Sequence, residues 1–238
     1  MVARKGVTKI AAEALKVLSA LLDESICVVP VSAVKVKLPE KGLVFDASTV
    51  AAFTDTLNKE KTFIPRTKAE QNPNVLQPIP CAVLRYKEKV LILKRNKPGH
   101  PLHDKYDVWA GGHVSETDNG PDILRNTLYR ELNEEVFIKE AYDLPSQPIA
   151  LIRTNEDARA SRHIAVLYEL ALKSEDVALA LNQKEFRSTR GTSMSGRLID
   201  IKEIGDYYDE MGNWSKSIVD HFWPDQTQAV NKKQPLFG

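Results

Sequence analysis

The stretch GGHVSETDNGPDILRNTLYRELNEEVFI, from Gly111 to Ile138, decides the fold expected for this chain. Pro121 and Asp122 favour a helix start, because proline is tolerated at the first helical position and a carboxylate stabilises the positive end of the helix dipole. Apolar residues then recur at every fourth position and can be buried as one stripe: Leu124, Leu128, Leu132 and Val136. The sequence therefore predicts an amphipathic helix here, which could continue through residues 139–141.

Three glutamates lie beside this stripe within an arc of ~100°: Glu131, Glu134 and Glu135. Like charges three and four residues apart weaken a helix, so their clustering calls for an explanation. One explanation is a solvated helix face, with Arg130 as a partial counterion. The other is a set of hard oxygen ligands for Mg²⁺ or Mn²⁺, to which Gly111 or Gly112 would add a backbone carbonyl that no side chain obstructs.

This stretch resembles the signature of the Nudix hydrolases: glycine, five residues, glutamate, seven residues, then Arg-Glu-aliphatic-x-Glu-Glu-x-Gly-aliphatic. Residues 130–138 read Arg-Glu-Leu-Asn-Glu-Glu-Val-Phe-Ile, and Asp122 stands before Arg130 with seven residues between them, where the family has glutamate. Two features depart from the pattern. Nine residues rather than five separate Gly112 from Asp122, and Phe137 replaces the glycine that usually closes the helix in a left-handed conformation.

The resemblance implies an α/β fold, an α/β/α sandwich with a mixed sheet. It also implies divalent-metal-dependent hydrolysis of a diphosphate linkage in a small nucleoside-diphosphate-type (NDP-X) substrate, with Mg²⁺ or Mn²⁺ as cofactor. Glu134 and Glu135 would be the principal metal ligands, and Glu131 would complete the site or act as the base. Arg130 would orient Glu131 or pair with Asp122, which would then be structural.

Two alternatives to this enzyme remain open. Phe137 and the longer loop could have cost the fold its catalysis, which would leave a ligand sensor that binds a nucleotide-sugar or ADP-ribose-like molecule. A protein-interaction module would instead use the amphipathic segment 9–24 and the C-terminal residues around an inert core.

Further charged residues outside the helix are candidates for the site. The substrate phosphates could be bound by arginines, whose planar fork matches phosphate oxygens: Arg95, Arg153 and Arg162. In Nudix enzymes an additional acid or base commonly comes from outside the signature, and by position the candidates are Glu156, Asp157 and Glu185. Each of these, taken singly, also fits a solvated surface charge. His113 is expected to be a loop residue rather than a ligand, because Mg²⁺ prefers oxygen.

The chain divides, by pattern, into an N-terminal extension at residues 1–60, a Nudix domain at 61–223 and a flexible tail at 224–238. The extension is expected to hold the amphipathic helix, a strand over 25–38 that Pro30 interrupts, and a helix that begins at Asp46. The proline-rich segment after it, with Phe63-Ile-Pro-Arg, Glu70 and Gln77-Pro-Ile-Pro, resembles a subgroup of bacterial Nudix proteins in which a comparable segment packs on the domain.

The remaining elements follow from alternation and turn residues. A hairpin is expected with Lys87-Glu88 as its turn, followed by a short strand running into Gly111. The other expected strands are 149–154, 163–172 and 196–204, and a terminal helix has Trp214, Ile218, Val219 and Phe222 on its inner face.

Composition bounds the location and the partners. The chain has 238 residues, 42% of them hydrophobic and 27% charged, with a formal net charge of +1, so nothing global indicates nucleic-acid or membrane binding. Without an apolar run of about 20 residues or a secretory pattern, a cytoplasmic location is expected. Cys27 and Cys81 are expected to be buried thiols. A homodimer is a further possibility, because sheet edges and an amphipathic helix would need covering.

Overall fold

A computed structural model describes residues 23–38, 41–95, 104–156, 158, 160–179 and 196–227. Several expectations therefore lie outside the described residues: the amphipathic helix up to residue 22, Asp157, Glu185 and the tail beyond residue 227. Within the described part of the chain, no helix has both the length and the apolar character needed to cross a membrane.

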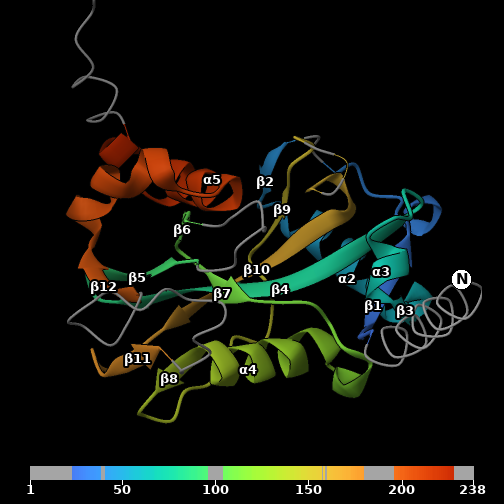
Figure 1. Ribbon diagram of the computed structural model, residues 1–238, viewed down its shortest axis with the longest axis horizontal. Helices are drawn as coiled ribbons and strands as arrows, with labels where there is room; N and C mark the ends of the chain where they lie inside the picture. Colours follow the sequence, from blue (N-terminus) through green and yellow to red (C-terminus); the bar gives the residue numbers. More distant parts are fainter. Residues whose placement is uncertain are drawn as a thin grey trace, which may run out of the picture.

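The fold is built on a mixed sheet whose central strand is β4 (Val75–Tyr86). Its main path runs β12-β5-β4-β10-β9-β2 (Figure 1). Strand β10 (His163–Ala171) is parallel to β4, from His163 opposite Gln77 to Ala171 opposite Arg85. The other pairs of this path are antiparallel and involve β2 (Gly42–Val44), β5 (Lys89–Lys94), β9 (Ala150–Arg153) and β12 (Gly196–Asp200).

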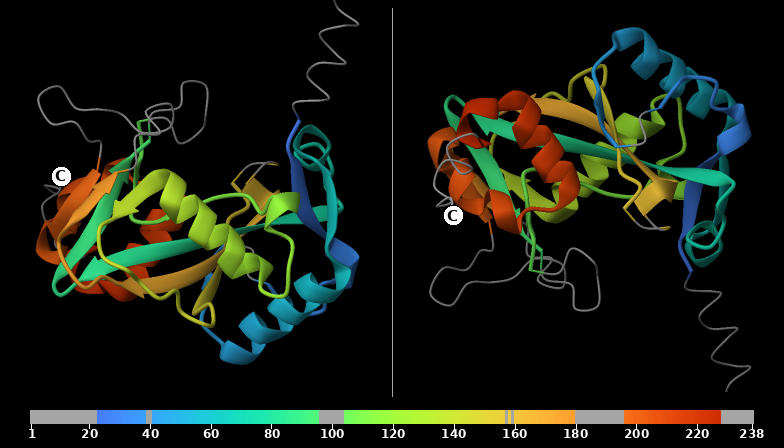
Figure 2. Two further views of the ribbon diagram at one scale, coloured as in Figure 1. Left: turned by 90° about the horizontal axis from the view of Figure 1, so that it is seen from below. Right: turned by 90° about the horizontal axis from the view of Figure 1, so that it is seen from above.

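Helices cover both faces of this sheet. Viewed from below, α4 (Ile123–Glu135) lies in front of the sheet, and viewed from above, α5 (Asn213–Phe222) does (Figure 2). Successive residues of β4 point to opposite faces, so Ala82 packs in the cluster that contains α4, and Val83 in the cluster that contains α5. The predicted α/β/α sandwich with a mixed sheet is confirmed, and the inner face of α4 is buried as its periodicity predicts. On the predicted inner face of α5, Ile218 and Val219 are buried, while Trp214 and Phe222 are partly buried.

The segment expected as an N-terminal extension contributes strands to the same sheet. Strand β1 (Ser25–Pro30) pairs with β3 (Thr62–Pro65) and with β4, while β2 pairs with β9. Contrary to the expectation of a strand over 25–38, β1 ends at Pro30 and a short 3-10 turn (Val31–Ala33) follows. Proline lacks the N–H that would continue the ladder, which accounts for the strand end.

Helix α2 (Ala47–Glu60) begins where the sequence predicts. The side chain of Asp46 accepts a hydrogen bond from the backbone N–H of Thr49 at 2.8 Å, a helix N-cap. The buried side chains of α2 join the same cluster as those of α4: Val50, Phe53 and Leu57. A shorter helix, α3 (Arg66–Ala69), follows β3 and leads into β4.

The chain reaches α4 through short pieces rather than one strand. Strand β6 (Tyr106–Asp107) pairs with β5, and β7 (Ala110–Gly111) pairs with β4. A 3-10 turn, η2 (Glu116–Asp118), then precedes the helix. Two more 3-10 segments lie later in the chain, η3 (Ala160–Arg162) and η4 (Ile201–Glu210), so the last expected strand ends at Asp200 instead of 204.

Helix α4 ends at Glu135 and does not run on through residues 139–141. Val136 is already extended, with φ −133° and ψ 120°, and begins β8 (Val136–Ile138). Strand β8 pairs with β11 (Val177–Leu179), with Phe137 opposite Ala178. Because the chain leaves the helix directly as a strand, no left-handed residue is needed at position 137, and phenylalanine fits there.

Candidate active site on helix α4

The last turn of α4 carries the three glutamates, and they differ in accessibility. The side chain of Glu134 is 52% exposed and that of Glu131 is 14% exposed, while that of Glu135 is 3% exposed. Glu134 is therefore exposed to solvent, Glu131 is mostly covered and Glu135 is buried. The sequence predicts these three groups on one helix edge, and the structure adds that their exposure to solvent differs.

Arg130 links this edge to the preceding loop. Its Nη1 lies 2.8 Å from Oε1 of Glu131 and 3.4 Å from Oε1 of Glu134, so one guanidinium nitrogen donates to both acids. Its Nη2 donates to the carbonyl oxygen of His113 at 3.0 Å. Hydrogen bonding to Asp118, with the nearby charge of Glu131, raises the pKa of Arg130 further above its usual range, and the guanidinium stays charged.

The acid that fixes Arg130 is Asp118. Nε and Nη2 of Arg130 contact Oδ1 and Oδ2 of Asp118, both at 2.9 Å. The Asp118 carboxylate also accepts from Thr127 Oγ1 at 2.8 Å and from the backbone N–H of Ser115 at 3.0 Å. Burial acts to raise the pKa of Asp118, but these hydrogen bonds and the charge of Arg130 outweigh it and lower the pKa.

The sequence left two roles open for Arg130, orienting Glu131 or pairing with Asp122, and the described contacts of Arg130 include Glu131. Asp122 lies 3.0 Å from Arg125 at the exposed start of α4, and the described ion pairs of Arg130 do not include it. A sequence signal for Asp118 was present, because five residues separate it from Gly112, as in the family pattern. The extra residues of this chain thus lie between the acid and the helix, not between the glycine and the acid.

The two glycines bring backbone close to the acids. A Cβ atom added to Gly112 would collide with the carboxylate of Glu131, so the backbone at this position lies directly against that side chain. Gly111 has φ +148°, a conformation that residues with a side chain rarely adopt, and a Cβ there would collide with the carbonyl oxygen of Pro80. Its N–H donates to Oε2 of Glu135 at 3.1 Å.

Glu135 belongs to a buried charge network beneath the glycine pair. Its Oε1 lies 3.4 Å from Nη1 of Arg95, whose Nε donates to Asp107 at 2.8 Å. Asp107 in turn accepts from the hydroxyl of Ser215 at the start of α5. Arg95, predicted to bind substrate phosphate, is only 10% exposed at its side chain and makes these internal contacts. These contacts hold Arg95 inside the fold, and its assignment to the substrate phosphates stays a prediction.

The other predicted residues lie on different elements. Nη2 of Arg153, at the end of β9, donates to the carbonyl oxygen of Ser161 at 3.2 Å, and Arg162 ends η3 next to β10. Glu156 contacts Asn213 at the start of α5 and lies 3.4 Å from Lys41. None of the described hydrogen bonds or ion pairs connects these three residues to the glutamates of α4.

The residues at the end of α4 fit a hard divalent cation by their chemistry. Glu134 has an exposed carboxylate, and the carboxylate of Glu131 lies against the backbone of Gly112, where no side chain intervenes. Carboxylate and carbonyl oxygens are the ligands that Mg²⁺ and Mn²⁺ prefer. Arg130 partly neutralises the negative charge of these two carboxylates.

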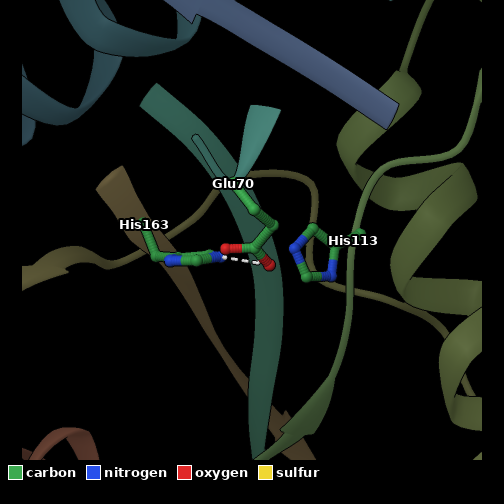
Figure 3. Close-up of side chains that lie close together, drawn as sticks. All are labelled: Glu70, His113 and His163. Carbon is green, nitrogen blue, oxygen red and sulfur yellow. Dashed lines mark ion pairs between the residues drawn. The ribbon is translucent and has the colours of Figure 1, made fainter. Parts of the chain in front are cut away.

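A second cluster of possible ligands was not predicted. Glu70 after α3, His113 in the loop after β7 and His163 at the start of β10 each offer one ligand atom, and these atoms lie within 4.8 Å of one another (Figure 3). The expectation that His113 is a loop residue holds, but its imidazole faces this cluster. The three positions are far apart in sequence, so no spacing pattern could have revealed them.

Comparisons with known proteins found one similar sequence and several similar structures. No protein-family model matches the chain. Protein YmaB of Bacillus subtilis strain 168 is 27% identical over 208 residues, which are 84% of this chain and 97% of YmaB. The crystal structure of Tm1382, a candidate Nudix hydrolase, is 23% identical, with a TM-score of 0.63 over 88% of this chain and 100% of that one. The NUDIX domain of NrtR from Shewanella oneidensis, solved with ADP ribose, is 15% identical, with a TM-score of 0.44 over 65% of this chain and 87% of that one. The likeness to Tm1382 shows that these two chains share one fold.

Proposed function

We propose, from the premise that this chain has the Nudix fold, that it is a divalent-metal-dependent hydrolase of a diphosphate linkage. The substrate class is a nucleoside-diphosphate-type compound (NDP-X), and the cation is Mg²⁺ or Mn²⁺. The single observation that carries the proposal is the contact of the Gly112 backbone with the carboxylate of Glu131, beside the exposed carboxylate of Glu134.

In this proposal the acids divide their roles according to exposure. Glu131 and Glu134 would hold the cation together with a carbonyl oxygen of the glycine pair. Glu135, which is buried and accepts the N–H of Gly111, would position that backbone and add charge from beneath. Its assignment as a direct ligand, made from the sequence, stays a prediction.

The bound cation would neutralise phosphate charge and lower the pKa of a coordinated water. The contribution of the chain is to hold the acids in place before the substrate arrives. Arg130, fixed by two hydrogen bonds to Asp118, limits where the Glu131 carboxylate can lie. Glu131 would either complete the cation site or accept a proton as the base.

The proposal is tested with a panel of NDP-X compounds and either Mg²⁺ or Mn²⁺. Released phosphomonoesters are converted to inorganic phosphate by an added phosphatase, and the thermal midpoint is recorded with and without cation. We expect turnover in the wild type, and its loss in Glu134→Gln together with a smaller cation-induced thermal shift. Glu140→Gln, an exposed glutamate beyond the end of α4, is the matched control and should behave as wild type. Unchanged turnover in Glu134→Gln would overturn the proposal.

A ligand sensor is the second candidate, and one observation favours it. The acids of α4 already have arginine neighbours, Arg130 for Glu131 and Glu134, and Arg95 for Glu135, so their charge is partly compensated without a cation. A sensor would bind an intact NDP-X compound tightly and leave it intact. Binding measured by calorimetry, with no phosphate release in the same sample, would select this function over the hydrolase.

A further inference from the structure

We propose that Glu70, His113 and His163 form a second cation site, distinct from the acids of α4, that takes a borderline divalent ion such as Zn²⁺. The three side chains come from three separate segments: the end of α3, the loop after β7 and the first residue of β10. Their ligand atoms lie within 4.8 Å of one another. Figure 3 shows the carboxylate of Glu70 between the two imidazole rings.

The distances are close to those of a bound ion. Nε2 of His163 lies 3.8 Å from Oε1 of Glu70, and the ring centroids of His113 and His163 are 5.4 Å apart. Four-coordinate zinc with bonds of about 2.0–2.1 Å holds its ligand atoms about 3.3 Å apart. The ligand atoms are thus farther apart than in a loaded site, and binding requires the three side chains to rotate toward the ion.

The backbone at all three positions is held by other contacts. His163 is in register with Gln77 on the central parallel strand pair. The N–H of Glu70 donates to the carbonyl oxygen of Arg66 at 2.9 Å, which closes α3. The carbonyl oxygen of His113 accepts from Arg130 at 3.0 Å. A site whose ligands are fixed before binding loses less conformational entropy when the ion enters.

The donor set distinguishes this site from the acids of α4. Two imidazole nitrogens and one carboxylate suit Zn²⁺ and its neighbours among the transition metals, whereas Mg²⁺ prefers oxygen ligands alone. Three protein ligands leave a fourth position for water or another donor. The side-chain oxygen of Gln77, which is fully buried, lies at hydrogen-bond distance from Nε2 of His113, 3.1 Å, and adds an oxygen donor beside the cluster.

Burial supports binding at this place. The side chains of His163 and Glu70 are 11% and 20% exposed, so an ion between them would be partly shielded from water. The competing explanation is an ion pair between Glu70 and a protonated His163, which would need no metal. The two explanations differ in one measurable property, the affinity for zinc.

The test uses the full-length protein, stripped with a chelator and titrated with Zn²⁺ in excess Mg²⁺, so that the oxygen site of α4 is occupied. Affinity is measured by competition with a chromophoric chelator, and stoichiometry by elemental analysis. We expect one Zn²⁺ per chain in the wild type and in Glu134→Gln. In His163→Asn and in Glu70→Gln the affinity should fall by at least about 100-fold, since each loses a ligand. His221→Asn, a histidine stacked on Phe45 away from the cluster, should bind as wild type.

A second measurement on the wild type does not depend on the folding of variants. Co²⁺ in place of Zn²⁺ should give the intense visible absorption of a four-coordinate site with nitrogen ligands. Absence of one bound Zn²⁺ in the wild type, or a weak octahedral Co²⁺ spectrum, would overturn the proposal. So would equal zinc affinity in folded His163→Asn, or loss of zinc in Glu134→Gln. The outcome is independent of turnover, so it does not depend on the proposed hydrolase.

Discussion

Asp118 and Arg130 form a two-point ion pair that joins the 3-10 turn η2 to helix α4. Both oxygens of Asp118 contact the guanidinium, each at 2.9 Å, and the same guanidinium contacts Glu131 at 2.8 Å. Asp118 is thus linked to the proposed cation site through a single intervening side chain. The position of Arg130, and with it that of Glu131, depends on an aspartate that precedes the helix.

Asp118→Asn should destabilise the protein by about 2–3 kcal/mol, because a buried acceptor of several hydrogen bonds loses its charge opposite Arg130. Turnover should fall on the order of 10²-fold, since the acids of α4 lose their alignment. Urea denaturation and initial rates measure the two effects. The matched control is Asp122→Asn at the exposed pair with Arg125, which should cost under about 1 kcal/mol. A larger effect at Asp122 than at Asp118 would contradict the assignment.

Gly112→Ala should separate function from stability. The new methyl group would push against the carboxylate of Glu131, a flexible group that can move away, so the free energy of unfolding should change by less than about 1 kcal/mol. The cation-induced thermal shift and the turnover should both fall sharply. Gly111→Ala is the contrasting variant: its φ of +148° and the collision with Pro80 should cost at least about 2 kcal/mol. Equal stability losses in the two variants would count against the proposed contact.

Phe137→Gly should not improve the enzyme, although it restores the glycine of the family pattern. Phe137 is 59% exposed in β8 and is extended opposite Ala178, so the position has no need for a left-handed residue. Glycine within a strand costs about 0.5–1 kcal/mol, and we expect a loss of that size with unchanged turnover. Chemical denaturation and the phosphate assay check both. A clear gain in turnover would show that Phe137 limits catalysis.

Asp46 should make the stability of α2 depend on pH. Hydrogen bonds from the side chains of Ser48 and Thr49, together with the N–H of Thr49, lower the pKa of Asp46 to about 2. The unfolded chain has the ordinary value of about 3.9, so the stabilisation is complete above about pH 4 and is lost as the pH falls through the folded pKa.

The comparison for this prediction is Asp46→Asn, which keeps a cap acceptor but cannot ionise. The thermal midpoint of the wild type should exceed that of Asp46→Asn above about pH 4, and the difference should shrink toward about pH 2. Circular dichroism across this range measures both proteins. A difference that stays constant with pH would show that ionisation of Asp46 contributes nothing to the helix.

Local patterns predicted most elements of the fold. The apolar stripe of α4 is buried at Leu124, Leu128 and Leu132, and the α2 cap and the hairpin turn at Lys87 lie where the residues indicate. These features depend on neighbours in the sequence, so periodicity and turn chemistry suffice. The predicted continuation of α4 through residues 139–141 was wrong, because the chain after Glu135 pairs as β8 with β11, a tertiary contact.

The site was predicted less completely, for a different reason. The acids of α4 share one helix turn and could be grouped from their spacing. The burial of Arg95 depends on Asp107 and Glu135, which approach it only in the folded chain. The cluster of Glu70, His113 and His163 depends on three segments that the sheet brings together. The sequence could have indicated Asp118, because the spacing from Gly112 matches the family pattern. However, the extra residues between Gly112 and Arg130 could be placed on either side of the acid.

The parallel pairing of β4 with β10 has a consequence for synthesis of the chain. Residues 77–85 pair with residues 163–171, which are synthesised much later. The centre of the sheet therefore cannot form until residues 163–171 have left the ribosome. Until then, one long edge of β4 offers unsatisfied N–H and C=O groups to any neighbouring polypeptide. Nascent chains arrested before residue 163 should therefore be the species most in need of a chaperone.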